Sequence, residues 1–197
     1  MNKIIENMIN RRSIRNFTSE KVDENILKEI VKAGLYAPSS KNKQSWHFTV
    51  IQNQEILETF NKDTKDAIKK YASEKVTDEA KLKKLTSRAN NDNYDTFYKA
   101  PVAIIISTDK SNKSSIKDCA VASENLMLAA ESFGLGSCWM SFMKHLFNLD
   151  KVKGSQYYKM FDIPENFTPA YAIVIGHKAN ETTKIMERRE NTVTYLL

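Results

Sequence analysis

Two short, uninterrupted apolar runs place the strongest limit on how this chain can fold. Residues 102–106 (Val-Ala-Ile-Ile-Ile), which follow Pro101, and residues 171–175 (Tyr-Ala-Ile-Val-Ile) predict buried strands. Between them, residues 115–133 form the most apolar of the predicted helices, and Gly134 ends it. The apolar positions of this helix follow a three–four spacing: Cys119, Ala122, Leu126, Ala129 and Phe133. Such a stripe is typical of a core helix or of a helix–helix contact.

The rest of the chain mixes helices with a few strands at uneven spacing. Asp23 can cap a helix, and residues 46–51 alternate as a strand. Residues 54–90 and about 144–161 are helical in tendency, whereas residues 192–197 alternate like a strand without a partner nearby in its own chain. Because regular strand–helix–strand repeats are missing, we predict an α+β fold, with one domain over the whole chain, residues 1–197.

Composition and charge exclude several classes of protein. Hydrophobic residues make up 41% of the 197 residues and charged residues 27%, which is typical of a globular protein. The net charge of +6 comes from bases spread among acids, so no nucleic-acid partner is expected. The two cysteines form no disulfide framework and favour a reducing compartment.

Membrane association is also not expected. No apolar run reaches the ~18 residues that span a bilayer. Residues 1–9 predict an amphipathic helix and not a signal peptide, which needs a continuous apolar stretch. The apolar face of this helix consists of Ile4, Ile5, Met8 and Ile9. We therefore expect a cytoplasmic protein.

Common catalytic motifs are missing from the sequence. It has no Walker A loop and no Gly-x-Ser-x-Gly elbow. Gly134-Leu135-Gly136 is not a dinucleotide fingerprint, because Trp139 occupies the third glycine position and a helix precedes the motif. The three histidines have no metal-ligand spacing, and no neighbour in the sequence would lower the pKa of the Cys138 thiol. We expect no metal and no catalytic acid, base or nucleophile.

Two polar clusters remain as candidate binding elements. The first, the arginine segment (residues 11–15), contains three arginines and a serine. Guanidinium groups match phosphate and carboxylate geometry, although a plain basic surface turn has the same composition. The second, the polar loop (residues 38–46), places hydroxyls and amides between an apolar helix and an apolar strand. On its own, this loop is typical of an ordinary solvated turn.

Together the two clusters resemble the nitroreductase family. The first motif is Arg11-Arg12-Ser13-Ile14-Arg15-Asn16-Phe17, and the second is Ala37-Pro38-Ser39-Ser40-Lys41-Asn42-Lys43-Gln44-Ser45-Trp46-His47-Phe48. Phe133-Gly134-Leu135-Gly136-Ser137-Cys138-Trp139 resembles the family's segment after its central helix. Ile175-Gly176-His177, the later Arg188-Arg189 and the strand-like tail resemble its C-terminal region. The resemblance covers essentially the whole chain and is strongest in the first fifty residues.

The resemblance implies a central mixed or antiparallel sheet flanked by helices. It also implies a homodimer that exchanges its C-terminal strand and carries two FMN molecules at the interface. NADH or NADPH would supply a hydride, which the flavin passes through N5 to an electron-poor acceptor such as a nitroaromatic or a quinone, by a ping-pong mechanism. Two alternatives remain open. One is a non-catalytic or regulatory flavin-binding protein of the same fold, and the other is a same-fold enzyme with a different acceptor, acting by enone reduction or dehalogenation.

The cofactor contacts of the family carry over residue by residue. In the arginine segment they are Arg11, Arg12, Ser13 and Arg15, with Arg11 at the phosphate and Arg15 at the pyrimidine end of the ring. The contacts from the opposite subunit are Pro38, Ser39, Ser40, Asn42 and Gln44. The backbone at Met140 and Ser141 would face the ring near N5, and Arg188 and Arg189 would be further phosphate ligands.

Overall fold

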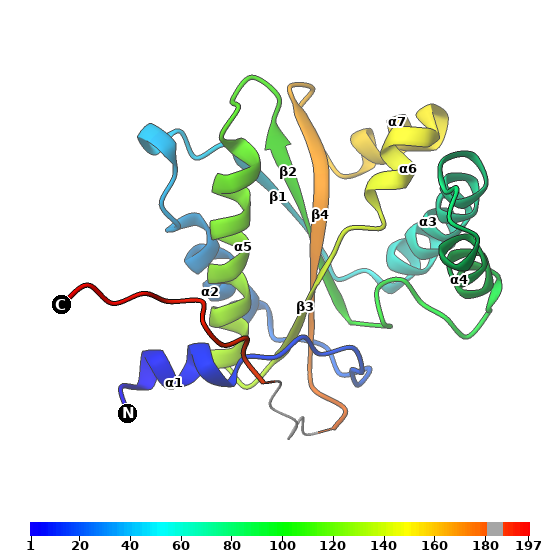
Figure 1. Ribbon diagram of the computed structural model, residues 1–197. Coiled ribbons are helices and arrows are strands. Elements are labelled where there is room, and N and C mark those ends of the chain that lie inside the picture. Colours follow the sequence, from blue (N-terminus) through cyan, green and yellow to red (C-terminus); the bar gives the residue numbers. More distant parts are fainter. Residues whose placement is uncertain (181–186) are drawn as a thin grey trace.

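A four-stranded antiparallel sheet with the order β1-β2-β4-β3 forms the centre of the fold in the computed structural model (Figure 1). The structure describes residues 1–180 and 187–197. The strands are β1 (Trp46–Ile51), β2 (Val102–Asp109), β3 (Gly136–Met140) and β4 (Phe167–Gly176). Both predicted apolar strands are present and are longer than the runs that predict them. The α+β fold class and the central sheet are confirmed.

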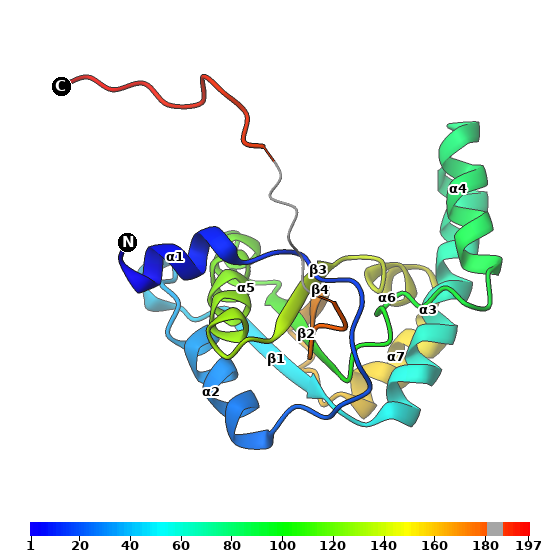
Figure 2. The ribbon, with the colours of Figure 1, turned by 90° about the horizontal axis from the view of Figure 1, so that it is seen from below.

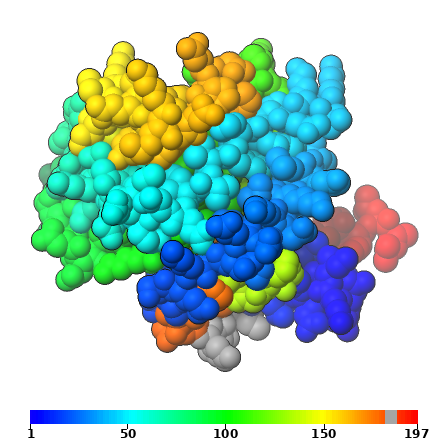
Figure 3. All heavy atoms as spheres, turned by 180° about the vertical axis from the view of Figure 1, so that it is seen from behind, coloured from blue at the N-terminus to red at the C-terminus, as the bar shows by residue number. Residues whose placement is uncertain are grey.

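Both faces of the sheet are buried because helices cover each of them. On β2, Ala103 and Ile105 enter one hydrophobic cluster, whereas Ile104 and Ile106 enter the other. The helices α2 (Glu24–Leu35) and α5 (Ser115–Ser132) lie on one face (Figure 1). The helices α3 (Gln54–Lys75), α6 (Lys144–Leu149) and α7 (Lys151–Met160) lie on the other. Figure 3 shows α2, α3 and α7 together on one surface of the molecule.

The apolar stripe of α5 belongs to the core of its own chain. Cys119, Ala122 and Leu126 are fully buried in the cluster shared with α2, whereas Phe133, at the end of the stripe, is 46% exposed. A Cβ at Gly34 of α2 would lie 2.6 Å from Leu126 Cδ2. The glycine therefore allows α2 to approach α5 closely.

Two predicted helical regions are each interrupted at an aspartate. The region 54–90 divides into α3 and α4 (Glu79–Asn90), where Asp78 accepts a hydrogen bond from the Lys81 amide at 2.6 Å. The region 144–161 divides at Asp150, which accepts from the Lys153 amide at 2.9 Å. In both places the side chain caps a new helix and favours the break.

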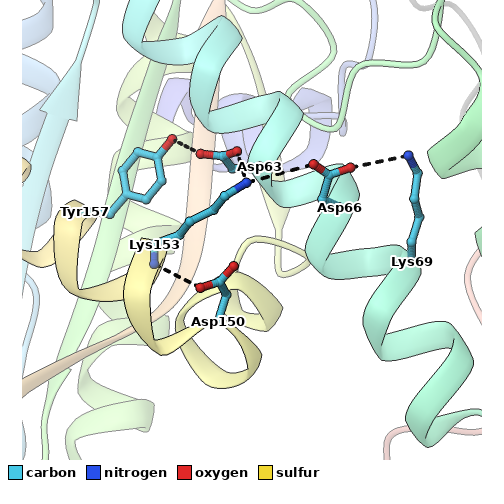
Figure 4. Close-up of polar contacts among 6 residues, drawn as sticks. All are labelled: Asp63, Asp66, Lys69, Asp150, Lys153 and Tyr157. Carbon is cyan, nitrogen blue, oxygen red and sulfur yellow. Dashed lines mark hydrogen bonds and ion pairs between the residues drawn. The ribbon is translucent and has the colours of Figure 1, made fainter.

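The α3–α4 hairpin has a small hydrophobic cluster of its own. Its buried members are Ile68, Ala72, Leu85 and Ala89. Polar contacts tie α3 to α7 further along: Asp63 accepts from Lys153 Nζ at 2.6 Å and from the Tyr157 hydroxyl at 2.9 Å (Figure 4). The hairpin is therefore fixed at its base and packs on itself further out (Figure 2).

The two edges of the sheet differ. Residues 13–17 run along the β3 edge, where isolated bridges join Ser13 to Ser137 and Phe17 to Lys178. A Cβ at Gly136 would lie 2.8 Å from Ile14 Cβ, so the glycine permits this close approach. No strand among the described residues pairs with the outer edge of β1.

The two ends of the chain lie outside this core. The predicted first helix is α1 (Lys3–Asn10), which contacts α5 through a hydrogen bond from Asn7 Nδ2 to the Leu128 carbonyl at 2.9 Å. Residues 187–197 are exposed and extend away from the body, and residues 192–197 are not paired as a strand with any described residue (Figure 2). The exchange of this tail between subunits stays a prediction. No helix in the described part of the chain is long and apolar enough to cross a membrane.

Candidate functional site

The arginine segment lies along the β3 edge of the sheet. The helix α1 ends at Asn10, and the Ile14 amide then donates to the Ser137 carbonyl at 2.9 Å. Because this contact fixes the segment against β3, its side chains lie beside that strand. The arginine segment is therefore an edge segment whose backbone is held by the sheet.

Arg11 has an incomplete set of partners. Its side chain is only 22% exposed, and its Nε lies 3.7 Å from Glu124 Oε1 on α5. Its Nη1 is buried and has no hydrogen-bond partner among the described residues. A buried guanidinium N–H without an acceptor is costly. An anion from outside the chain, such as a phosphate, would supply the missing acceptor.

The other two arginines of the segment have different surroundings. Arg12 turns back on the end of α1, where its Nη1 donates to the carbonyls of Ile9 and, at 2.9 Å, Arg11. Arg15 is exposed, and its Nη1 donates to the Ser13 carbonyl at 3.3 Å. Arg15 Cζ also lies 6.0 Å from the centre of the Tyr98 ring. Arg12 thus caps the end of α1, whereas Arg15 is exposed and can bind a ligand at the surface.

Cys138 is buried next to this segment. Burial raises the pKa of its thiol, while Arg15, Arg11 and a hydrogen bond with Ser13 act in the opposite direction. The sequence neighbours of Cys138 gave no sign of these groups, because the fold brings them from a distant segment. Since burial outweighs them, the thiol is neutral near pH 7 and is a buried small side chain.

The polar loop has an unusual backbone. It contains the short 3-10 helix η1 (Ser40–Asn42), and Lys41, Asn42 and Gln44 have φ values of 54°, 52° and 48°. Residues other than glycine adopt this left-handed backbone conformation at an energetic cost. Such residues cluster at ligand-binding sites. The side chains of Pro38, Ser40, Asn42 and Gln44 are exposed.

The loop and the arginine segment are far apart within one chain. Ser40 contacts Asp118 near the start of α5, whereas Arg11 contacts Glu124 in the second half of that helix. Figure 1 shows η1 and residues 11–15 near opposite ends of α5. One chain therefore does not bring the two predicted clusters together.

The remaining predicted contacts fall in two places. Met140 is buried at the end of β3, and Ser141 follows it as an exposed residue on the same edge of the sheet as Arg15. Arg188 and Arg189 are exposed in the tail, which points away from the body (Figure 2). Within one chain, Met140 and Ser141 thus lie near the arginine segment, and the tail arginines do not.

Two residues at these clusters are not apparent from the sequence. Tyr98, with φ of 58°, sits in a turn where Asp95 Oδ1 accepts from the amides of Phe97 at 2.7 Å and Lys99 at 3.2 Å. The only sequence signal is an aspartate that can form a local turn. Asp118 is an acidic residue in the first turn of α5, directly before the apolar stripe that begins at Cys119. That mismatch is a signal, but its partner Ser40 is 78 positions away.

A separate cavity does not include any of these residues. It has a volume of about 570 Å³ and lies against α7, where Lys110, Tyr158 and Lys159 are among its lining residues. The chemistry of the arginine segment therefore defines the candidate site, which is an anion site at the covered edge of an α+β sheet.

Comparisons with known proteins agree with this class of fold and site. A model of the nitroreductase family matches residues 8–177. A Methanothermobacter thermautotrophicus protein, provisionally named NADH dehydrogenase/NAD(P)H nitroreductase, is 31% identical over 181 residues, covering 89% of this chain and 78% of the relative. A Bacillus subtilis FMN reductase (NADPH) is 24% identical and is matched over 93% of this chain and 69% of its own length. The chain belongs to the nitroreductase family.

Solved structures share the whole fold. A Bacteroides fragilis nitroreductase crystallised with bound FMN has a TM-score of 0.86 at 30% identity, with 100% of both chains covered. A Desulfitobacterium hafniense nitroreductase, also with bound FMN, has a TM-score of 0.85 at 23% identity and covers 100% of this chain and 99% of its own. The second likeness concerns the fold alone.

Proposed function

We propose that this chain is an FMN-dependent oxidoreductase that transfers a hydride from NADH or NADPH to an electron-poor acceptor such as a nitroaromatic or a quinone. The observation that carries the proposal is the buried Arg11 Nη1, which has no acceptor among the described residues. It lies where the family resemblance puts the cofactor phosphate. The relatives named as NAD(P)H nitroreductases and FMN reductases support the same activity.

The residues of the chain would hold and orient the cofactor. FMN, when bound, accepts a hydride from the nicotinamide and delivers it to the acceptor. Arg11 and Ser13 would bind the phosphate, with Arg188 and Arg189 as further ligands. Arg15 would stabilise negative charge at the pyrimidine end of the ring, because it is the exposed guanidinium of the segment. Met140 and Ser141 would face the ring through their backbone.

The site would be shared between two subunits. The polar loop and the arginine segment contact α5 at different places, so the loop residues would complete the partner's site. These residues are Pro38, Ser39, Ser40, Asn42 and Gln44. The helix α1 supports a dimer, since Ile4, Ile5, Met8 and Ile9 are 66%, 50%, 52% and 46% exposed. Four neighbouring apolar side chains on one exposed helix face are typical of an interface.

The tail would cover a groove on the partner. An apolar groove of about 430 Å³ runs between α2 and the free edge of β1, and its lining includes Leu27, Val31, Leu35 and Val50. The tail offers Val193, Tyr195 and Leu196, which are 64%, 76% and 95% exposed. An extended segment can add to a free strand edge through its backbone while its side chains fill such a groove.

The absorbance spectrum of the purified protein tests the proposal most directly. We expect a bound flavin that chromatography identifies as FMN after heat release, and that bleaches when NADH or NADPH is added without oxygen. FAD, or no flavin after reconstitution, would overturn the proposal. A flavin that neither nicotinamide reduces would instead favour a non-catalytic, flavin-binding protein.

Steady-state kinetics test the order of the reaction. The given sequence shows one arginine segment and no dinucleotide fingerprint, so the nicotinamide and the acceptor would use one site in turn. We expect ping-pong kinetics with parallel double-reciprocal lines. Intersecting lines would show that both substrates bind together.

Sedimentation tests the shared site. We expect a dimer at micromolar concentration, and a weaker dimer when residues 192–197 are removed. A stable monomer that retains flavin would contradict the proposal. We place the protein in the cytoplasm, because both cysteines are free and buried and suit a reducing compartment.

A further inference from the structure

The polar loop is held at both ends by one buried carboxylate and its neighbour. Asp118 is 5% exposed and lies in the first turn of α5. Its Oδ1 accepts from the Ser40 amide at 3.0 Å, and its Oδ2 lies 3.4 Å from Asn112 Nδ2. The same Asn112 nitrogen donates to Ser45 Oγ at 2.5 Å. Asp118 and Asn112 thus connect the start of the loop to its end.

Contacts within the loop also contribute to its shape. Within it, the Gln44 amide donates to Ser39 Oγ at 2.9 Å, and the Asn42 amide donates to the Ser39 carbonyl at 3.0 Å. The left-handed residues Lys41, Asn42 and Gln44 disfavour this conformation in an isolated chain. The surroundings must therefore select it. Asp118 bonds to the loop backbone at Ser40, whereas the Cys119 thiol and the Asp109 amide bond to the Ser45 carbonyl at the end of the loop.

Asp118 lies in α5 beside residues that pack the hydrophobic core. Its neighbours in the α5 stripe, Cys119 and Ala122, are small apolar residues that are fully buried. Burying a carboxylate is costly unless hydrogen bonds and favourable charge compensate. The Ser40 amide, Asn112 and the positive end of the helix dipole provide that compensation. An apolar residue at position 118 could not accept the hydrogen bond from the Ser40 amide.

We propose that Asp118 is a positioning residue for the cofactor site of the partner subunit. It holds the polar loop in the left-handed conformation that presents Ser39, Asn42 and Gln44 to the partner. This inference rests on the proposed function, because it takes the loop to contact FMN across the dimer. Asp118 itself does not touch the cofactor.

The expected effect follows from the population of the ordered loop. When only a fraction of molecules has the binding conformation, the apparent Kd is the intrinsic Kd divided by that fraction. If Asp118→Ala lowers the ordered fraction to roughly one tenth, the Kd for FMN rises about tenfold. The chemistry at the ring would be unchanged once the flavin is bound.

Two readouts on the full-length dimer test the inference. The first is the Kd for FMN, measured by fluorescence titration of the flavin-free protein. The second is the rate of tryptic cleavage after Lys41 and Lys43, which reports loop order without any flavin. For Asp118→Ala we expect a Kd raised about tenfold or more and faster cleavage at both lysines. Asp118→Asn keeps an acceptor for the Ser40 amide, so we expect its Kd to stay within about threefold of the wild type.

Asp63→Ala is the matched control. Asp63 is another largely buried carboxylate with two donors, Lys153 and Tyr157, and it lies on the other side of the sheet (Figure 4). We expect this variant to lose thermal stability without any change in the Kd for FMN or in cleavage of the loop. If Asp118→Ala does not fold, Asn112→Ala removes the link to Ser45 while it leaves the Ser40 contact, and we expect it to raise both readouts.

The outcomes separate the inference from the function on which it rests. Unchanged cleavage and unchanged Kd in the Asp118 and Asn112 variants would overturn the inference. Faster cleavage with an unchanged Kd would also overturn it, because the loop would then be held without serving the cofactor. If Asp63→Ala raises the Kd for FMN as much as Asp118→Ala does, the effect of Asp118→Ala is a general loss of stability. If the wild type binds no FMN, the proposed function fails, whereas the cleavage rates still report whether Asp118 holds the loop.

Discussion

Arg11 and Arg15 come from one short segment, but their surroundings give them different capacities. Arg11 is mostly buried against Glu124 with one nitrogen unpartnered among the described residues, whereas Arg15 is exposed beside Tyr98. A buried guanidinium can hold a phosphate firmly because competing water is excluded. An exposed guanidinium on the same edge can reach a group that extends further from the sheet.

We expect Arg11→Ala to weaken FMN binding by roughly ten- to a hundredfold, because one charge-assisted hydrogen bond contributes about 1.5–3 kcal/mol. Arg15→Ala should instead slow reduction of the bound flavin by a similar factor. Stopped-flow reduction of both variants with excess FMN, together with a binding titration, measures the two effects. If Arg11→Ala, fully loaded with FMN, is reduced more slowly than Arg15→Ala, the roles assigned to the two arginines are reversed.

His145 is expected to make stability depend on pH. Its ring stacks on Tyr71 with centres 3.9 Å apart, and burial, together with Lys144, lowers its pKa from 6.5 to about 4. Between these values the unfolded chain binds a proton that the folded chain does not. The contribution of His145 is therefore fully present above pH 6.5 and is lost as the pH falls toward 4.

The variant His145→Phe keeps an aromatic ring but cannot take up a proton. We expect its loss of melting temperature between pH 7 and pH 5 to be smaller than that of the wild type. Thermal melts at the two pH values, with His47→Phe as the control, check this. Equal losses in wild type and His145→Phe would show that the ring does not titrate in this range.

At the scale of elements, the α3–α4 hairpin is the part whose stability depends least on the packing of the sheet. Its cluster of Ile68, Ala72, Leu85 and Ala89 is separate from the two clusters that cover the sheet. We expect Leu85→Ala, which removes a side chain that is 8% exposed, to cost about 2–5 kcal/mol, felt mainly within the hairpin. Hydrogen exchange should become faster in α4 and stay unchanged in α5. Leu126→Ala, in the core under α5, should instead speed exchange throughout, and an equally general effect of Leu85→Ala would refute a separate unit.

Element types can be predicted from this sequence where the signal is local. The apolar runs at 102–106 and 171–175 specify strands because no other short element buries every side chain, and Asp23 caps α2 through the amides of Asn25 and Ile26. The breaks at Asp78 and Asp150 escape prediction, because the residues on both sides favour helix. At each aspartate the chain can either continue the helix or begin a new one that the side chain caps. Packing on other elements determines which of the two forms.

The site is less predictable than the elements. The types of residue in the arginine segment indicate an anion, but the contact of Arg11 with Glu124 joins residues that are distant in the sequence. Likewise, the role of Asp118 is recognised only from its hydrogen bond with Ser40, which is 78 positions away in the sequence. Such contacts arise from the packing of α5 on the segments before it, and no local pattern encodes them. The family resemblance supplies roles for residues that physical reasoning on the sequence leaves open.

At the scale of the whole molecule, α5 sets the distance between the two candidate binding elements. Asp118 holds the polar loop near its start, and Glu124 and Leu128 contact the N-terminal segment further along. A helix rises ~1.5 Å per residue and is stiff over this length, so the separation does not relax. Under the proposed function, a dimer would bring the loop of one subunit to the arginine segment of the other, and each subunit would hold half of each site.

Two defective proteins should consequently repair each other when their subunits are mixed. An Arg11→Ala subunit still carries an intact loop, and an Asp118→Ala subunit still carries an intact arginine segment. A heterodimer of the two would contain one site with both defects and one site with neither. Co-expression with two different affinity tags isolates this species, and we expect it to bind about half the FMN of the wild-type dimer with wild-type affinity, although each parent homodimer binds weakly. If the mixed dimer is as poor as its parents, each site is built within a single chain, and complementation between alleles is impossible for this protein.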